Sequence, residues 1–369
     1  MSKLADSIIK WGYYLLFFLV PLWFYAANSE LFEYNKMMLT YGLTIIIVTA
    51  WLIKLIANHQ SLITPWKWIK RTPLDIPIVL YLLSHILSTL FSLDPHVSIW
   101  GYYSRFHESL LSTLSYILLY YVAVSNLNRH HVINILRISF LSAALVSVYG
   151  IFEHFGHSPS CLFITGNFNV DCWVQDVKNR VFATLGQPNW MAAYLDVILL
   201  SVLGFLFSGP SLSVFGHLVT DRLKTGKPNS DNRQLKTDEW KLIILVILAA
   251  ATFAALWFTR SRSGLGALGV GIAVFILFSL KIIPQKLKVT ICVIALAFAA
   301  VGGWIWFDRL PVTSSGISES GVIRKPVWIG AIKVWQRYPI FGSGVETFAY
   351  AYYQDRPVEH NLLSEWDFL

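Results

Sequence analysis

Two arginines stand in a short turn between two long apolar runs, in the stretch Thr259-Arg260-Ser261-Arg262-Ser263. Charge at a membrane edge is costly unless the side chain reaches lipid headgroups or meets a partner. A guanidinium group matches a phosphate or diphosphate through paired hydrogen bonds, and Gly264 and Gly266 leave room for a ligand or another helix. The turn, with Arg260 and Arg262, therefore predicts an anion site. Snorkelling to lipid phosphates is the alternative.

A second basic group, Arg324 with Lys325, opens a stretch near the end of the chain. Residues 323–337 have helical apolar spacing, which predicts an amphipathic helix lying against a membrane surface. Arg324 is expected at the start of this helix, where an anion also meets free backbone N–H groups. The alternative is a basic helix that touches anionic lipid.

The connection 153–188 carries a third group. Arg180 leads toward Pro188 and Asn189, which are ordinary helix start signals, and both Arg180 and Asn189 are candidate ligands of a substrate. The helix that follows contains Asp196 at a depth where a carboxylate should face the bundle interior, either paired with a cation or as the neutral acid. Asp196 is as well explained by structure as by function.

The same connection contains His154, His157, Cys161 and Cys172. In an oxidising compartment, a disulfide between the two cysteines is favoured and would stabilise the fold by about 3 kcal/mol. Zinc is the weaker alternative, because the spacing fits no standard site. We therefore assign no metal and no cofactor.

The elements that must position these residues are membrane-spanning helices. The 369 residues are 55% hydrophobic and 14% charged, and the apolar residues form uninterrupted runs near the bilayer-spanning length of about 20 residues. This predicts an all-α polytopic membrane protein with about nine transmembrane helices, over 8–26, 37–56, 75–92, 108–125, 132–152, 189–208, 241–259, 263–280 and 287–306. The net charge is +8, and the basic residues that produce it lie between the apolar runs rather than in a separate basic domain. Nucleic acid is therefore excluded as a partner.

Alternation of the basic residues predicts how the chain crosses the membrane. The connections on the side of the N-terminus hold seventeen Lys and Arg residues, against six on the opposite side before the tail. Because positive charge marks the cytoplasm, the N-terminus is expected inside. The predicted domains are then a bundle over 1–306, with outer loop 153–188 and inner loop 209–240, and an outer loop over 307–369. We expect the natural sequence to continue beyond Leu369.

Taken in order, these motifs resemble the O-antigen ligase and polymerase family of bacterial envelope enzymes. The resemblance rests on Ser261-Arg262 at an outer helix start, Gly186-Gln187-Pro188-Asn189 before an earlier span, and Arg324 with Trp328 followed by Pro339-Ile340-Phe341-Gly342-Ser343-Gly344 and Phe348. Less specific matches are Glu30-Leu31-Phe32-Glu33 with Lys36, and Gly101-Tyr102-Tyr103-Ser104-Arg105.

The resemblance implies a fold similar to the polytopic glycosyltransferases that use polyprenyl-linked donors. It also implies inverting, metal-independent transfer of a glycan from an undecaprenyl-diphosphate-linked donor to a lipid, glycan or protein acceptor. The reaction would take place at the outer face of the bacterial cytoplasmic membrane, with membrane lipids around the protein. Carried over by motif, Arg262 and Arg324 would hold the diphosphate and stabilise its developing charge, and Arg105 would contribute to substrate binding.

His360-Asn361 matches the dipeptide in which the family places its candidate base or acceptor-orienting group, although the chain ends before the accompanying glycine. His360 is therefore included as a catalytic candidate. Within the family, a repeat-unit polymerase and a protein O-oligosaccharyltransferase are alternatives to a ligase. From other classes, a small-anion carrier of the bicarbonate type would depend on Asp196 and His85, and a scaffold without catalysis would need neither arginine.

Overall fold

The computed structural model describes residues 2–28, 30–57, 69–103, 105–208, 232–280, 284–308 and 319–362. Most of the predicted inner loop 209–240, and parts of the predicted outer loop 307–369, lie outside these ranges. Within them the chain is helical and has no β-strand. The helices are α1 (Ser2–Leu22), α2 (Glu33–Ala57), α4 (Asp75–Leu90), α5 (Pro95–Trp100), α6 (Leu110–Asn126), α7 (Arg129–His154), α8 (Pro159–Thr165), η2 (Ala183–Leu185), α9 (Pro188–Ser208), α11 (Asn232–Phe258), α12 (Arg262–Ser279), α13 (Gln285–Asp308), α14 (Glu319–Arg337), α15 (Phe348–Asp355) and α16 (Val358–Leu362).

Five of the described helices, α1, α2, α7, α9 and α12, are long and apolar enough to cross a bilayer. Helices α4 and α6 and the apolar part of α11, Leu242–Phe258, are shorter apolar helices, and α13 covers the last predicted span. Large apolar side chains such as Ile76, Val79 and Leu80 of α4 are exposed, which suits contact with lipid rather than water. The predicted all-helical membrane class is confirmed in this form, and the count of nine spans stays a prediction.

Helix α11 begins at Asn232, inside the region predicted as a loop. The prediction of a loop up to residue 240 is therefore wrong for its last nine residues. Gln234, Lys236 and Glu239 are good helix formers, and a helix can continue beyond its apolar segment into water because its backbone groups stay hydrogen-bonded. The hydropathy of the sequence indicates which part of a helix lies in the lipid, but the helix itself can extend further.

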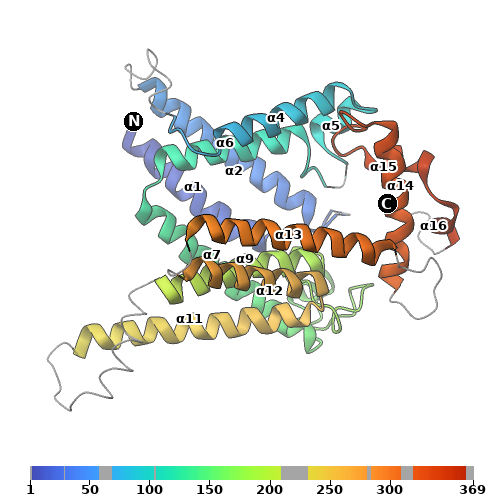
Figure 1. The fold of residues 1–369 in the computed structure, drawn as a ribbon. Helices are drawn as coiled ribbons and strands as arrows, with labels where there is room; N and C mark the ends of the chain where they lie inside the picture. Colours follow the sequence, from blue (N-terminus) through green and yellow to red (C-terminus); the bar gives the residue numbers. More distant parts are fainter. Residues whose placement is uncertain are drawn as a thin grey trace. The chain divides into compact units, whose positions relative to one another are not determined.

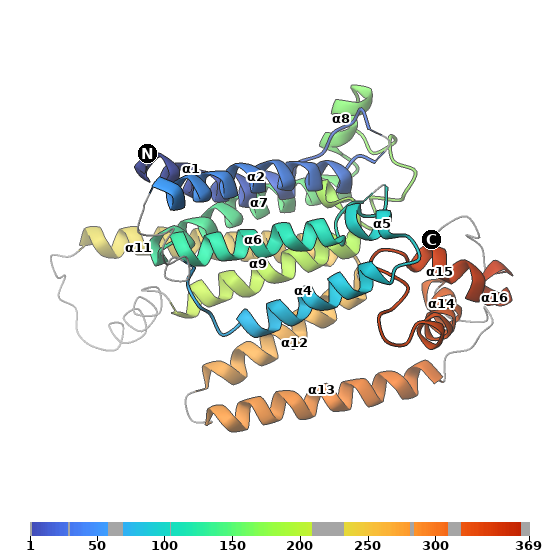
Figure 2. The same cartoon turned by 90° about the horizontal axis from the view of Figure 1, so that it is seen from above.

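Contacts divide the chain into two compact units, described one at a time. The first unit comprises Met1–Lys54 and Asn126–Ser279. In it α7 packs against α1, α9 and α11, and α9 also contacts α12, as Figures 1 and 2 show. Its core contains fully buried Val146, Met191, Leu195 and Leu256. Helix α9 thus holds the centre of the unit, and its first turn lies close to the first turn of α12.

The second unit comprises Leu55–Ser125 and Leu280–Leu369. Helix α4 contacts α5, and α14 packs against the short helices α15 and α16. Two side-chain pairs join α4 to α6: His85 with Thr113 at 3.4 Å, and Asp75 with Tyr121 at 3.1 Å. These polar contacts give the two apolar helices a defined alignment, because a hydrogen bond fixes register in a way that apolar contact alone does not.

Candidate functional site

The turn 259–263, the arginine turn below, joins the end of α11 to the start of α12. Arg260 adopts a left-handed backbone conformation with φ 50°, which is uncommon for a residue with a side chain. Thr259 stabilises it: its hydroxyl donates to the carbonyl of Leu256 at 2.7 Å and accepts the N–H of Ser261 at 3.2 Å. The strained residue is therefore held by its neighbours, as is common at functional sites.

Ser261 ties the arginine turn to the start of α9. Its hydroxyl accepts the N–H of Gly264 at 3.2 Å and so caps α12, and it donates to Oδ1 of Asn189 at 2.9 Å. Ser261 is buried, with only 2% of its surface exposed. Gly264 permits the approach, because a Cβ at this position would lie 2.6 Å from Cβ of Ala192. The prediction that Gly264 leaves room for a neighbouring helix is confirmed.

Three arginines gather around this junction. The N–H of Val181 donates to the carbonyl of Phe258 at 3.3 Å, which brings Arg180 next to the arginine turn. Arg180, Arg260 and Arg262 are all exposed, and no carboxylate of the described residues forms an ion pair with any of them. Unpaired guanidinium groups at one end of a bundle are suited to bind a polyanion. The structure thus brings together four of the predicted residues, since Asn189 lies in the same junction.

Glu153, which sequence reasoning missed, anchors the segment that follows Arg180. It lies in the last turn of α7 with none of its surface exposed. Its Oε2 accepts the N–H groups of Phe182 at 3.3 Å and Ala183 at 2.8 Å, and its Oε1 accepts from the hydroxyl of Ser158 at 3.3 Å. The available signal was a carboxylate at the end of an apolar run, where such a group is costly without partners.

Lys36 has a structural role in the same unit. Its ammonium group donates to the carbonyls of Val20, Pro21 and Trp23 at 2.8 to 3.0 Å, which are orphan acceptors at the end of α1. Thr184 also donates to the carbonyl of Pro21, at 2.7 Å. Lys36 therefore holds the end of α1, which in turn contacts Thr184 of the 181–186 segment.

A disulfide joins Cys161 to Cys172, as favoured over zinc from the sequence. His154 does not turn toward the cysteines: its ring stacks on Phe258 with centroids 3.8 Å apart, and its Nδ1 lies 2.7 Å from the carbonyl of Lys178. Among the described residues no group of three potential metal ligands comes together. Asp196 is 7% exposed in α9, and its Oδ1 has no hydrogen-bond partner in the described part of the chain.

In the second unit, Arg324 and Lys325 lie in α14, with Arg324 exposed and Lys325 half-buried. The predicted placement of Arg324 at the helix start is wrong, because α14 begins at Glu319. Arg324 is therefore in the second turn, where backbone N–H groups already bond within the helix. An anion near Arg324 would meet the side chain and not the helix terminus.

His360 is buried against Tyr352. Its Nδ1 lies 3.0 Å from the Tyr352 hydroxyl, and 3% of the histidine is exposed. Gly330 of α14 makes room for this pair, since a Cβ there would lie 2.3 Å from the Tyr352 ring. The histidine singled out by the sequence thus belongs to the packing between α14, α15 and α16 in this structure.

The motif Pro339–Gly344 lies in a loop, residues 338–347, that packs on the segment after α4. Phe341 stacks on Phe91 with centroids 4.5 Å apart, and the carbonyl of Ser343 accepts the N–H of Leu93 at 2.8 Å. Gly344 is required here, because its φ is 119° and a Cβ would clash with Ser92. Ser98 also donates to the carbonyl of Val345 at 2.8 Å, so the 338–347 loop and the stretch that begins at Gly101 are neighbours although they are far apart in sequence.

Between these two motifs lies His107, which sequence reasoning also missed. Its Nε2 is 3.8 Å from Oε1 of Glu108, and its Nδ1 is 3.9 Å from Oε1 of Glu346. Burial raises the pKa of the Glu346 carboxyl above its usual value, while His107 and Arg105 act in the opposite direction. Arg105, half-buried in the loop before His107, thus lies close enough to influence an acidic group.

Comparison with known proteins identifies one part of the chain. Residues 243–367 match the family model described as O-antigen ligase. The match includes the arginine turn, α14 with Arg324, the 338–347 loop and His360, but not Arg105, Arg180 or Asn189. No curated protein and no solved structure matches the chain. The resemblance inferred from the motifs is confirmed over these residues.

Proposed function

We propose that this protein, whose residues 243–367 carry the O-antigen ligase match, transfers a glycan from an undecaprenyl-diphosphate-linked donor to an acceptor hydroxyl. The observation that carries the proposal is the group of unpaired, exposed guanidinium groups at the junction of α9 and α12. A diphosphate needs permanent cations, and arginine remains charged at any physiological pH. The hydrogen-bonded frame of Thr259, Ser261 and Asn189 would hold these cations in place before the donor binds.

In the proposed reaction, the acceptor oxygen attacks the anomeric carbon of the donor sugar. A new carbon–oxygen bond forms while the bond to the diphosphate breaks, and its electron pair leaves with the diphosphate. Arg262 and Arg324 would stabilise this growing charge, with Arg260, Arg180, Asn189, Arg105 and Lys325 binding other parts of the substrates. Attack opposite to the leaving group inverts the configuration. The acceptor proton passes to a general base.

His360 is proposed as a positioning residue rather than the base itself. Its burial and its bond to Tyr352 support this choice, because a base must come within hydrogen-bond reach of the proton that it takes. Through Tyr352 the histidine would set the orientation of α15 and α14, and hence of Arg324. We place the reaction at the outer face of the bacterial cytoplasmic membrane, with the N-terminus cytoplasmic and residues 307–369 outside.

The test is a transfer assay on the full-length protein, with an undecaprenyl-diphosphate-linked glycan as donor and a panel of lipid, glycan and protein acceptors. Arg262→Ala should lower transfer at least about 100-fold, the typical effect of one lost charge-stabilising donor. Arg129→Ala is the matched control, since Arg129 is also exposed but stands at the other end of the first unit. Undiminished transfer in Arg262→Ala would overturn the proposal, and anion flux in vesicles that depends on Asp196 instead would favour a carrier.

A further inference from the structure

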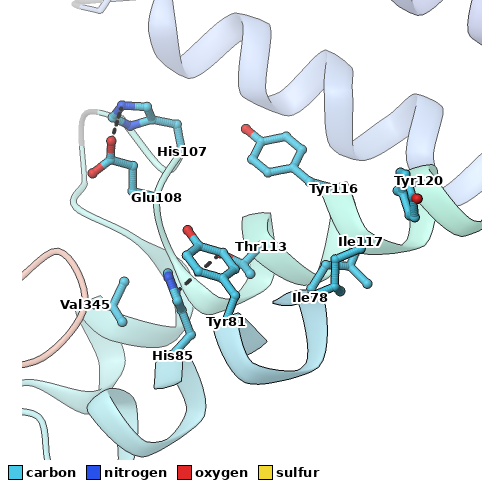
Figure 3. A pocket seen from close by; sticks show the side chains of 10 residues that line it. All are labelled: Ile78, Tyr81, His85, His107, Glu108, Thr113, Tyr116, Ile117, Tyr120 and Val345. Atoms are coloured by element: carbon cyan, nitrogen blue, oxygen red, sulfur yellow. Dashed lines mark hydrogen bonds and ion pairs between the residues drawn. The ribbon is translucent and has the colours of Figure 1, made fainter. Parts of the chain in front are cut away.

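The second unit contains a cleft between α4 and α6 whose lining includes none of the catalytic or substrate-binding residues predicted from the sequence. Its volume is about 570 Å³, within the range of about 300–1,000 Å³ typical of small-ligand sites. Figure 3 shows the side chains that line it, which come from both helices, from the loop before α6 and from the 338–347 loop. The hydroxyl of Ser98 donates to the carbonyl of Val345 at 2.8 Å and so fixes the last of these walls.

The lining is polar and aromatic rather than aliphatic. Seven of the ten lining side chains carry a hydrogen-bonding group, and Ile78, Ile117 and Val345 are the three that do not. The rings of Tyr81 and His85 are in contact, with centroids 4.3 Å apart and planes inclined by 54°, and Tyr116 projects from the opposite helix (Figure 3). A cavity for a lipid tail would not need so many polar groups at membrane depth, because each is costly without a partner.

The charge of the cleft also restricts its ligand. No Lys or Arg is among the lining residues, whereas Glu108 is, and Glu346 lies just behind His107. The side chain of Glu346 is only 10% exposed, and its Oε1 has no hydrogen-bond partner in the described part of the chain. The negative charge of Glu108 would repel a diphosphate, and no Lys or Arg among the lining residues would offset it, so the cleft is unsuited to the leaving group of the donor.

We propose that the α4–α6 cleft binds a neutral sugar residue, as the acceptor subsite of the transfer reaction. Tyrosine rings offer apolar faces for the C–H side of a sugar ring and hydroxyls at their edges. His85, His107 and Glu108 offer donors and acceptors to the sugar hydroxyls. The assignment of this cleft as the acceptor subsite rests on the proposed function. The binding of a neutral sugar can be tested without any transfer.

Cysteine protection provides that test. In full-length protein with Cys292→Ser, so that no free thiol remains beside the disulfide, Tyr116→Cys is placed in the cleft. A hydrophilic maleimide should label it, and neutral sugars should slow the labelling at least about threefold. The probes are glucose, galactose and N-acetylglucosamine, each tested at concentrations up to about 100 mM. Inorganic diphosphate is the charged control. Leu114→Cys is the matched control, because Leu114 is similarly exposed on the same helix but does not line the cleft.

Protection by at least one sugar, with none by diphosphate and none at Leu114→Cys, supports the proposal. Absence of labelling at Tyr116→Cys would show a cleft filled by lipid and would overturn it, as would labelling that no sugar slows or that diphosphate slows. To guard against a misfolded variant, Glu108→Gln in a Tyr116→Cys background should weaken the protection while leaving the labelling rate without sugar unchanged. Because no donor is present, failure here is distinct from failure of the transfer assay.

Discussion

Ser261 donates a hydrogen bond to Oδ1 of Asn189 at 2.9 Å and thereby fastens the first turn of α12 to the first turn of α9. The two residues are 72 positions apart; Ser261 stands between Arg260 and Arg262, and Asn189 is itself a candidate ligand of a substrate. A buried hydrogen bond of this kind fixes geometry more than it adds stability, because its net contribution is only about 1 kcal/mol. Its consequence is that Arg260 and Arg262 project from a frame that exists before the donor arrives.

Loss of this frame should affect catalysis more than folding. Ser261→Ala removes the cap of α12 and the bond to Asn189, so we expect the free energy of unfolding to fall by about 1 to 2 kcal/mol. We expect transfer to fall by more than the fraction of unfolded protein explains, because misplaced arginines stabilise the leaving group less. Thermal unfolding and transfer rates of Ser261→Ala, with the conservative Ser261→Thr beside it, measure both. A loss of transfer that tracks unfolding alone would contradict this expectation.

The close packing at Gly264 makes a second prediction. Gly264→Ala places a methyl group where 2.6 Å separates it from Cβ of Ala192, so α12 must move away from α9. Overpacking of this kind typically costs about 1 to 3 kcal/mol. Ala192→Gly in the same protein should restore part of the loss, whereas Gly266→Ala, which meets nothing within 4 Å, should be tolerated. Equal unfolding temperatures for the Gly264 and Gly266 variants would argue against the packing described.

Sequence reasoning found the helices because bilayer length and apolar content are strong constraints, and it found the arginine turn because two cations there are anomalous. It could not find Glu153, because two of the three donors to its carboxylate, the N–H groups of Phe182 and Ala183, lie 29 and 30 residues further along the chain. It also missed His107, since neither Glu108 nor Glu346 identifies a partner without the fold. Arg324 was predicted in the first turn but lies in the second, because the apolar spacing begins at Ile323 whereas α14 begins at Glu319.

Glu153 should be needed for the 181–186 segment. Glu153→Ala leaves the N–H groups of Phe182 and Ala183 without their acceptor in a buried position, which costs about 1 to 3 kcal/mol for each unsatisfied group. We expect a lower unfolding temperature and faster hydrogen exchange at Phe182 and Ala183. Glu153→Gln keeps one acceptor oxygen and should retain much of the stability. Identical exchange rates in Glu153→Ala and the unaltered protein would show that this carboxylate does not anchor the segment.

The disulfide between Cys161 and Cys172 should stabilise the same unit. By loop-closure entropy, a bond across 11 positions contributes about 3 kcal/mol. Reduction, or Cys161→Ser with Cys172→Ser, should therefore lower the unfolding temperature in detergent solution. Cys292→Ser is the control, because that thiol is free. A double variant that unfolds at the temperature of the control would show that the bond adds nothing.

Glu346 predicts how stability depends on pH. Its pKa is raised in the folded protein by burial, so the folded state holds the proton more tightly than the unfolded state. The sign follows from linkage: stability from this group is fully present below the unfolded pKa and is lost as pH rises through the raised folded value. Glu346→Gln should flatten the fall in unfolding temperature from about pH 4 upward, relative to the unaltered protein. A steeper fall in the variant would contradict the assignment.

The proposed function requires that the cations of the arginine turn and of α14 lie at the same membrane face and bind one diphosphate. Accessibility labelling tests this most directly. The variants Arg260→Cys and Arg324→Cys, each in the Cys292→Ser background, are produced in bacterial cells. Spheroplasts of these cells, whose cytoplasmic membrane is intact, are treated with a membrane-impermeant maleimide. We predict that both positions are labelled without permeabilising the cytoplasmic membrane. Labelling of one position only after permeabilisation would place the two sets of cations on opposite sides, and no shared diphosphate site could then exist.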